Sequence, residues 1–300
     1  MIYTCYGLTF VSDLALPELL AAAASAARSE PDVQIRLGQV PTEGLTDGRQ
    51  RGPFLWVSPR ALWLRVPRIA RFLVSDGNLI TIAPEPGVDE DSIRVFLLGS
   101  ALGALLFQRG LLVLHGNAIR IGEQCMVCVG ASGAGKSTLA AGFLRRGYEI
   151  LGDDVIAVDA DCRALPGFPR IKLWQDTAQR LHIDTAQLRR IRPALAKFNY
   201  PLASPVIGVP LPIRWVYILG SHPLPDTRCE PIHGLERFTP LRNNTYRVRF
   251  LEGMALKREH LQLCGKLAGR IHLTRITRPE RGFELDALVD RILADLAAHP

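Results

Sequence analysis

The feature that most constrains this sequence of 300 residues is a glycine-rich stretch near its middle. It matches the pattern G-x-x-x-x-G-K-[ST] at every constrained position. The stretch consists of Gly130, Ala131, Ser132, Gly133, Ala134, Gly135, Lys136, Ser137 and Thr138. An apolar run at 125–129 predicts a buried strand before it, and residues 137–146 predict a helix that Gly147 ends. A strand, a glycine loop and a helix in this order predict a phosphate-binding P-loop.

The residue types of this loop indicate a specific chemistry. Glycines let the backbone curl so that its N–H groups converge on phosphates, and the helix N-terminus adds a positive dipole end. Lys136 would bridge the β- and γ-phosphates of a nucleotide, and the Ser137 hydroxyl would hold Mg²⁺. A simple glycine turn with a surface lysine would explain neither the Lys-Ser pair nor its placement.

Two neighbouring carboxylates follow the loop. Asp153 and Asp154 come 17 and 18 residues after Lys136, where Gly152 interrupts the strand expected at 148–158. One helix and half a strand return the chain beside the loop, and successive strand residues point to opposite faces. One acid could therefore hold a metal ion or its water, and we assign Asp153 to this task. The other could accept a proton from an attacking hydroxyl. An acidic turn between strands is the plainer alternative.

The rest of the chain predicts an α/β fold in two parts. Residues 1–90 form a β-rich N-terminal subdomain with strands expected at 2–10, 32–37, 54–57, 61–66 and 71–82, and a helix at 17–27. A helix from Asp89 to about Phe107 begins a second domain, 91–300, where strands and a helix alternate. A strand at 111–114 ends at His115, beside the loop's own strand. Further on we expect a helical stretch at 176–197, a strand at 214–219 and a final helix at 284–298.

Composition excludes several classes of protein. The net charge is +7, and residues 162–200 hold eight basic residues against two acidic ones, with only four aromatic side chains among them. This favours a solvated face or a surface for phosphates or an acidic partner, and disfavours nucleic acid. The longest uncharged apolar run has thirteen residues and the start lacks a secretory signal, so we expect no membrane segment and a cytoplasmic location. The six cysteines suggest no disulfide framework, and Cys125 and Cys128 belong to a strand.

Four segments together resemble the nucleotide-binding domain of the HPr kinase family, which has an HPr kinase/PEP carboxykinase-like P-loop core. The segments are Leu114-His115-Gly-Asn-Ala, the glycine-rich stretch, Arg146-Gly147-Tyr148 and Leu151-Gly-Asp153-Asp154-Val-Ile. The similarity covers residues 110–160. Residues 166–174 and 241–246 resemble the HPr kinase-related proteins of modified-peptide clusters, which include lasso-peptide tailoring kinases.

The resemblance implies ATP and Mg²⁺ as cofactors, with Asp154 as proton acceptor, His115 and Lys136 in the active site and Ser137 on Mg²⁺. It also implies a catalytic arginine, for which Arg242 and Arg247 are the candidates, and Arg170 and Lys197 are further candidate ligands for phosphate or substrate. The implied acceptor is a serine near the C-terminus of a precursor peptide. Since the family includes hexamers, a homo-oligomer is one possible assembly.

The sequence also departs from the family. Thr138 stands where HPr kinases usually carry Glu, the family's later metal-binding Glu has no clear counterpart, and the first ninety residues differ. These departures argue against HPr itself as substrate and against the reverse phosphorolysis. The leading hypothesis is an ATP-dependent serine kinase that acts on a peptide or small protein. The alternatives are an HPr kinase/phosphorylase, a kinase of a small metabolite, and a nucleotide-sensing module without catalysis.

Overall fold

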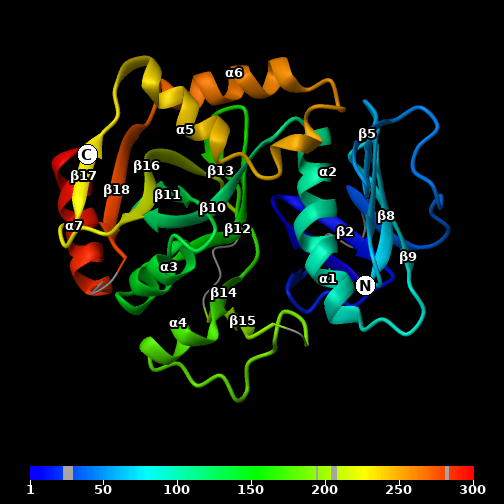
Figure 1. The fold of residues 1–300 in the computed structure, drawn as a ribbon, viewed down its shortest axis with the longest axis horizontal. Coiled ribbons are helices and arrows are strands. Elements are labelled where there is room, and N and C mark those ends of the chain that lie inside the picture. Colours follow the sequence, from blue (N-terminus) through cyan, green and yellow to red (C-terminus); the bar gives the residue numbers. More distant parts are fainter. Residues whose placement is uncertain (23–29, 194, 204–207, 281–283) are drawn as a thin grey trace.

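The chain has a mixed α/β fold in a computed structural model that describes residues 1–22, 30–193, 195–203, 208–280 and 284–300. A large sheet made by the first 84 residues stands on one side, and a second sheet with its helices stands on the other. A helical column separates the two, as Figure 1 shows. The N-terminal region is therefore β-rich, as the sequence predicts.

The N-terminal sheet has nine strands in the order β3-β1-β2-β4-β9-β8-β7-β6-β5. Their bounds are β1 Ile2–Cys5, β2 Leu8–Ser12, β3 Leu20–Ala21, β4 Val33–Leu37, β5 Arg49–Gly52, β6 Leu55–Val57, β7 Ala61–Val66, β8 Ala70–Ser75 and β9 Leu79–Pro84. Burial alternates along β8 and β9, so every second side chain enters the core. The expected strand at 2–10 is in fact the hairpin of β1 and β2, with Tyr6 at positive φ in its turn.

The helical column consists of α1 Glu90–Phe96, a π-helical turn η2 Leu97–Ala101 and α2 Leu102–Gln108. Asp89 caps it, because its side chain accepts a hydrogen bond from the Ser92 N–H. The column shares one hydrophobic core with the N-terminal sheet, and Val113 and Val155 of the second sheet belong to the same core. This core contains residues from both sides of the domain boundary predicted near residue 90, so that boundary stays a prediction.

The second sheet has the order β11-β10-β12-β13-β16-β18-β17, and β11 also pairs with β16. Its strands are β10 Leu112–Ile121, β11 Gln124–Gly130, β12 Ile150–Val158, β13 Arg163–Ala164, β16 Leu211–His222, β17 Arg228–Pro231 and β18 His272–Pro279. β10 runs antiparallel to both β11 and β12, whereas β16 is parallel to β11 and to β18. The strand that leads into the glycine-rich stretch therefore lies between β10 and β16.

Helices cover both faces of this sheet. On one face lie α3 Lys136–Arg145 and α7 Leu285–Ala298, and on the other α5 Phe238–Asn243 and α6 Lys257–Ala268. β11 shows the division, because Cys125 and Val127 belong to the core under α6, and Met126 and Cys128 to the core under α3. A small two-stranded sheet consists of β14 Arg170–Trp174 and β15 Lys197–Pro201. The helix α4 Gln175–Arg180 follows β14 directly in the chain.

Four expectations need correction. The helix predicted at 17–27 is wrong over its described part, where residues 17–19 turn and β3 follows, and residues 23–27 lie outside the described residues. The helical stretch predicted at 176–197 ends with α4 at Arg180, and Lys197 begins β15. The strand expected to end at His115 continues to Ile121. β12 continues through 152–154, although its register shifts at Leu151 and Asp154 has a positive φ.

The cysteine and membrane expectations can be compared with the same structure. Cys125 and Cys128 are both fully buried in β11, where burial raises the pKa of Cys125 to about 12. The six cysteines are free thiols. Among the helices in the described ranges, none is long and apolar enough to cross a bilayer.

We predict that the helical column depends on Gly103 for space. An added Cβ there would lie 2.8 Å from Tyr246 Cε1, whereas a Cβ on Gly265 of α6 would meet nothing within 4 Å. Gly103→Ala should therefore lower the free energy of unfolding by about 1 kcal/mol or more, despite the better helix propensity of alanine. Gly265→Ala, the matched control, should raise it by up to about 1 kcal/mol. Urea unfolding of both variants would measure this, and equal effects would contradict the packing argument.

Candidate active site

The glycine loop (residues 130–135) joins the end of β11 to the start of α3. Only glycine fits at position 130, since its φ is 148° and a Cβ would lie 2.4 Å from the Leu219 carbonyl oxygen of β16. Lys136 Nζ donates to the carbonyl oxygens of Gly130 and Ala131 at 2.8 and 2.9 Å. The loop thus wraps around the ammonium group, as expected for a lysine held ready for phosphates.

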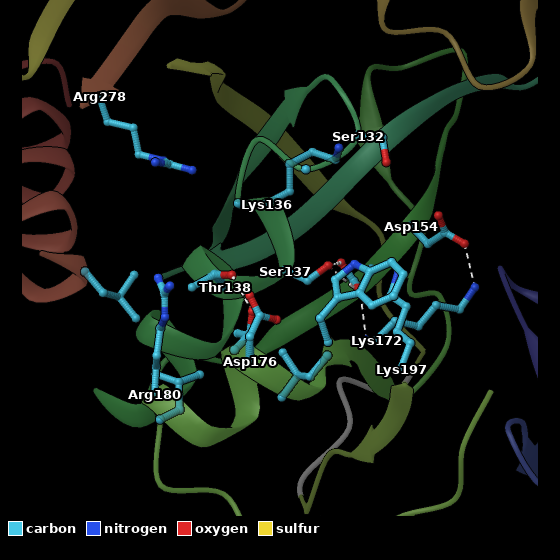
Figure 2. A pocket seen from close by; sticks show the side chains of 18 of the residues that line it. Ser132, Lys136, Ser137, Thr138, Asp154, Lys172, Asp176, Arg180, Lys197 and Arg278 are labelled. Carbon is cyan, nitrogen blue, oxygen red and sulfur yellow. Dashed lines mark hydrogen bonds and ion pairs between the residues drawn. The ribbon is translucent and has the colours of Figure 1, made fainter. Parts of the chain in front are cut away.

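A cavity of about 1180 Å³ opens in front of this loop. Its lining includes Gly133, Gly135, Lys136, Ser137 and Thr138, as well as both acids of β12. Figure 2 shows Lys172 and Lys197 on one side of the cavity and Arg180 and Arg278 on the other. A cavity with cations on both sides of a glycine loop suits a polyanionic ligand.

Asp153 lies next to the first turn of α3. The Ser137 hydroxyl is 3.0 and 3.2 Å from its two carboxylate oxygens, and the Lys172 backbone N–H donates to Oδ2 at 2.9 Å. The side chain is almost completely buried, and this burial raises the pKa of its carboxyl group. A hydroxyl and a carboxylate side by side are the oxygen ligands that Mg²⁺ prefers, so the donor set fits this ion.

Asp154 follows on β12 and also lines this cavity. Its φ is 81°, a conformation rare for residues other than glycine, which turns its side chain toward Lys172 and His115. Lys172 Nζ lies 2.6 Å from Asp154 Oδ2, and His115 Nδ1 lies 3.4 Å from Oδ1. Burial raises the pKa of Asp154, but the Lys172 ammonium outweighs it, helped by Lys197, and holds this pKa well below its usual range.

His115 lies opposite Val155 in the pairing of β10 with β12. Its Nδ1 is 3.0 Å from the Asp154 carbonyl oxygen, which can only accept, so Nδ1 carries the proton. Burial lowers the pKa of His115, and the nearby Lys136 lowers it further. The imidazole is therefore neutral near pH 7, with Nε2 free to accept a hydrogen bond.

A second cavity of about 430 Å³ adjoins the first. The two share His115, Ser132, Asp154 and Lys172. Its other walls come from the residues after α5 and from the helical column, namely Asn243, Asn244, Thr245, Tyr246, Arg247, Val95, Phe96 and Gly99, together with Gly130 and Ala131. Asp154 thus faces the cavity of the glycine loop and a separate cavity beside it.

Tyr246 and Arg247 shape the second cavity. The buried Tyr246 ring packs against Gly103, and its hydroxyl lies close to Gly99. A Cβ added to Gly99 would be 3.1 Å from this hydroxyl oxygen. Arg247 follows with φ of 42°, and its guanidinium carbon lies 5.6 Å from the centre of the Tyr246 ring. A non-glycine residue in this backbone region is held there by its surroundings. The exposed Arg247 therefore projects from a fixed point at the cavity rim.

The structure gathers most of the predicted residues, and their roles remain predictions. Ser132 and Lys136 to Thr138 line the first cavity with both acids, His115 and Lys197. Ala134 lines neither cavity but accepts a hydrogen bond from Arg278 through its carbonyl oxygen. Arg242 also lines neither cavity and lies near His260 and Cys264, so its placement does not support a catalytic role, whereas Arg247 lines the second cavity. Arg170 is buried and bonded to Asn199.

Sequence reasoning missed Lys172, Arg180 and Arg278 as site residues. Lys172 contacts both acids, through its backbone N–H and its ammonium group. Arg278 donates to the Ala134 carbonyl oxygen at 3.3 Å, and burial and the nearby Arg180 lower its pKa. Lys172 and Arg180 belong to the basic segment 162–200, so the local excess of charge was the available signal. Arg278 comes from β18, far along the chain, and no motif marked it.

Comparisons with known proteins give one distant similarity. No family model matches the chain, and no curated protein matches it. Among solved structures, it is similar to the Hpr(Ser) kinase/phosphatase from Coxiella burnetii, with 14% sequence identity over 62% of this chain and 96% of that chain, and a TM-score of 0.28. At this TM-score the residues of the site must carry any functional assignment.

The ion pair at Asp154 gives a prediction on its titration. Lys172→Met removes the nearest positive charge, so the pKa of the Asp154 carboxyl should rise toward or above its usual range because burial then dominates. Lys197→Met, the matched control, removes a weaker influence and should raise it less. Carbon-13 NMR of labelled aspartate carboxyls across a pH series would measure both, and a larger rise in the control would contradict the assignment.

Proposed function

We propose that this chain is a kinase that uses Mg²⁺ and ATP to phosphorylate a serine hydroxyl on a peptide or small protein. The observation that carries this proposal is the position of Asp154, which lies where the cavity of the glycine loop meets the second cavity. A phosphoryl donor in the first cavity and a hydroxyl in the second would meet at this carboxylate. Phosphoryl transfer needs this in-line arrangement of donor and acceptor.

The glycine loop would bind the triphosphate through its N–H groups, and Lys136 would exchange its contacts with two loop carbonyls for phosphate oxygens. Ser137 and Asp153 would hold Mg²⁺, which when bound would neutralise phosphate charge. On the other side of the cavity, Arg180 and Arg278 supply further positive charge for the rest of the nucleotide. These binding groups line one cavity.

Asp154 would accept the proton of the acceptor hydroxyl. As that oxygen bonds to the γ-phosphorus, the bond from phosphorus to the bridging oxygen breaks and ADP leaves. Paired with Lys172, the carboxylate is a weak base. The Lys172 ammonium has three N–H donors, so it can turn toward the γ-phosphate and strengthen the base when a nucleotide is bound. In a loose transition state, this positioning and charge stabilisation matter most.

The second cavity points to the class of acceptor. Its volume of about 430 Å³ suits a side chain with a few flanking groups, presented by a flexible segment. Phe96 and Tyr246 provide apolar walls, and Asn243, Asn244 and Arg247 provide polar contacts. A precursor peptide modified near its C-terminus is the acceptor suggested by residues 166–174 and 241–246. A small metabolite of similar size is the competing acceptor, since the cavity volume accommodates it equally.

Asp154→Asn should separate catalysis from binding. Transfer should fall by roughly 10²–10⁴-fold, because the proton acceptor is lost, while affinity for nucleotide changes little. Intact-mass analysis of small proteins and peptides encoded beside this gene, incubated with Mg-ATP, would show one added phosphate on a serine-containing peptide with the unmodified enzyme only.

Other outcomes would redirect the proposal. Normal transfer by Asp154→Asn would contradict the role of this residue. Phosphate added to metabolites and to none of the peptides would favour a metabolite kinase. Nucleotide binding without any product, and with a partner whose binding changes in Lys136→Ala, would favour a sensing module.

Arg247 and Arg242 form a matched pair for testing the second cavity. Arg247→Ala should raise the KM for the acceptor about tenfold, because one charged contact at the cavity rim is lost. Arg242→Ala should leave it within about twofold, since that side chain lines neither cavity. Steady-state kinetics with the identified acceptor would measure both, and the reverse order of effects would restore Arg242 as the catalytic candidate.

A further inference from the structure

The small sheet of β14 and β15 carries an aromatic ring and an ammonium group in contact on the wall of the first cavity. Trp174 of β14 lies directly opposite Lys197 of β15 in the pairing of these strands. Lys197 Nζ lies 5.3 Å from the centre of the Trp174 ring. Both side chains line the cavity of the glycine loop, and 47% of Trp174 is exposed. Aromatic side chains on a cavity wall are typical of ligand sites.

Lys197 differs from the other two lysines that line this cavity. Lys136 donates to two carbonyl oxygens of the glycine loop, and Lys172 is paired with Asp154. Within the described residues, no carboxylate or carbonyl oxygen accepts a hydrogen bond from the Lys197 ammonium group, which lies over the face of the Trp174 ring. A ring face attracts a cation but gives its N–H groups no oxygen acceptor. The three donors of Lys197 are therefore available to a ligand.

The charges around Lys197 favour an anion at this place. Burial lowers the pKa of its ammonium group, Lys172 lowers it further, and Asp154 and Asp153 raise it. Figure 2 shows Lys197 beside Lys172, on the Asp154 side of the cavity and away from the two arginines. A phosphate bound next to Asp154 would therefore have Lys197 as its neighbour, and it would relieve the repulsion between the two lysines.

We propose that Lys197 and Trp174 distinguish ATP from ADP by responding to the γ-phosphate. This inference rests on the proposed function, because it places the γ-phosphate next to Asp154. Before nucleotide binds, the ammonium group lies on the Trp174 ring. With ATP bound, the flexible lysine side chain turns to a γ-phosphate oxygen, since a charge-assisted hydrogen bond to phosphate is stronger than the contact with a ring. ADP offers no such oxygen, so it binds less tightly and leaves after transfer.

The backbone beneath the pair is held on both sides. β15 pairs with β14 along its whole length, from Lys197 to Pro201. On its other edge, the Ile191 N–H donates to the Lys197 carbonyl oxygen and the Asn199 N–H donates to the Arg189 carbonyl oxygen, both at 2.9 Å. The response to the γ-phosphate is therefore a rotation of the Lys197 side chain alone.

The test measures nucleotide binding to the full chain without an acceptor. The probes are ADP and an ATP analogue with a β–γ imido bridge, both with Mg²⁺, and isothermal titration calorimetry gives each affinity. In the unmodified chain, the analogue should bind at least about tenfold more tightly than ADP. Lys197→Met should weaken the analogue about tenfold and ADP less than about twofold, because only the analogue carries the γ-phosphate. Lys197→Arg keeps the positive charge and should keep most of the preference.

Arg190→Met is the matched control. Arg190 also stacks on an aromatic ring of the small sheet, with its guanidinium carbon 5.7 Å from the centre of the Phe198 ring, but it lines neither cavity. This variant should leave both affinities within about twofold of the unmodified chain.

Tryptophan fluorescence gives a second readout that needs no variant of Lys197. The ATP analogue should change the emission of the unmodified chain more than ADP does, because it draws the ammonium group away from the indole. Trp174→Phe should remove this difference, although three of the four tryptophans remain.

The outcomes separate this inference from the proposed function. A Lys197→Met variant that keeps the preference for the analogue, or that loses affinity for both nucleotides equally, would overturn the inference and leave the kinase proposal intact. Emission that responds equally to both nucleotides would do the same. Failure of either nucleotide to bind the unmodified chain would contradict the proposed function itself, and this inference with it.

Discussion

Lys172 is the residue on which the geometry of the site depends. Its backbone N–H holds Asp153 beside Ser137, and its ammonium group holds Asp154 beside His115. One residue of β14 thus bonds to the carboxylates of two neighbouring residues of β12. Burial raises the pKa of Asp153 although Lys172 opposes the rise, whereas the Lys172 ammonium holds the pKa of Asp154 low, so two adjacent acids titrate differently.

The local elements of the site were predictable from the sequence. The strand β11, the glycine loop and α3 follow one another within 22 residues, and the periodicity of apolar residues and the glycines define each of them. The expectation that Asp153 and Asp154 point to opposite faces rested on strand alternation, but Asp154 has a positive φ and both side chains line the first cavity. The assignments of Ser137, His115 and Lys136 rest on residues that lie close to this motif and that the structure gathers around one cavity.

Contacts between distant segments were not predictable in the same way. Arg278 reaches the glycine loop because β18 pairs with β16, and a single sequence does not encode this pairing in any local pattern. Arg242 and Arg247 are only five positions apart, but Arg242 belongs to α5 and lines neither cavity, whereas Arg247 has a positive φ and lines the second cavity. The predicted helix at 176–197 failed because β14 and β15 pair across it, and this pairing overrides helical propensity.

Tyr246 packs against Gly99 and Gly103 of the helical column, and this contact links the column to the second cavity. Because Val95, Phe96 and Gly99 form one wall of the second cavity, the column that packs on the β-rich sheet also shapes the part of the chain that carries the glycine loop. Substitutions in the core between the N-terminal sheet and this column would shift that wall while leaving the glycine loop untouched. Changes in that core would therefore alter the shape of the second cavity through residues that do not line it.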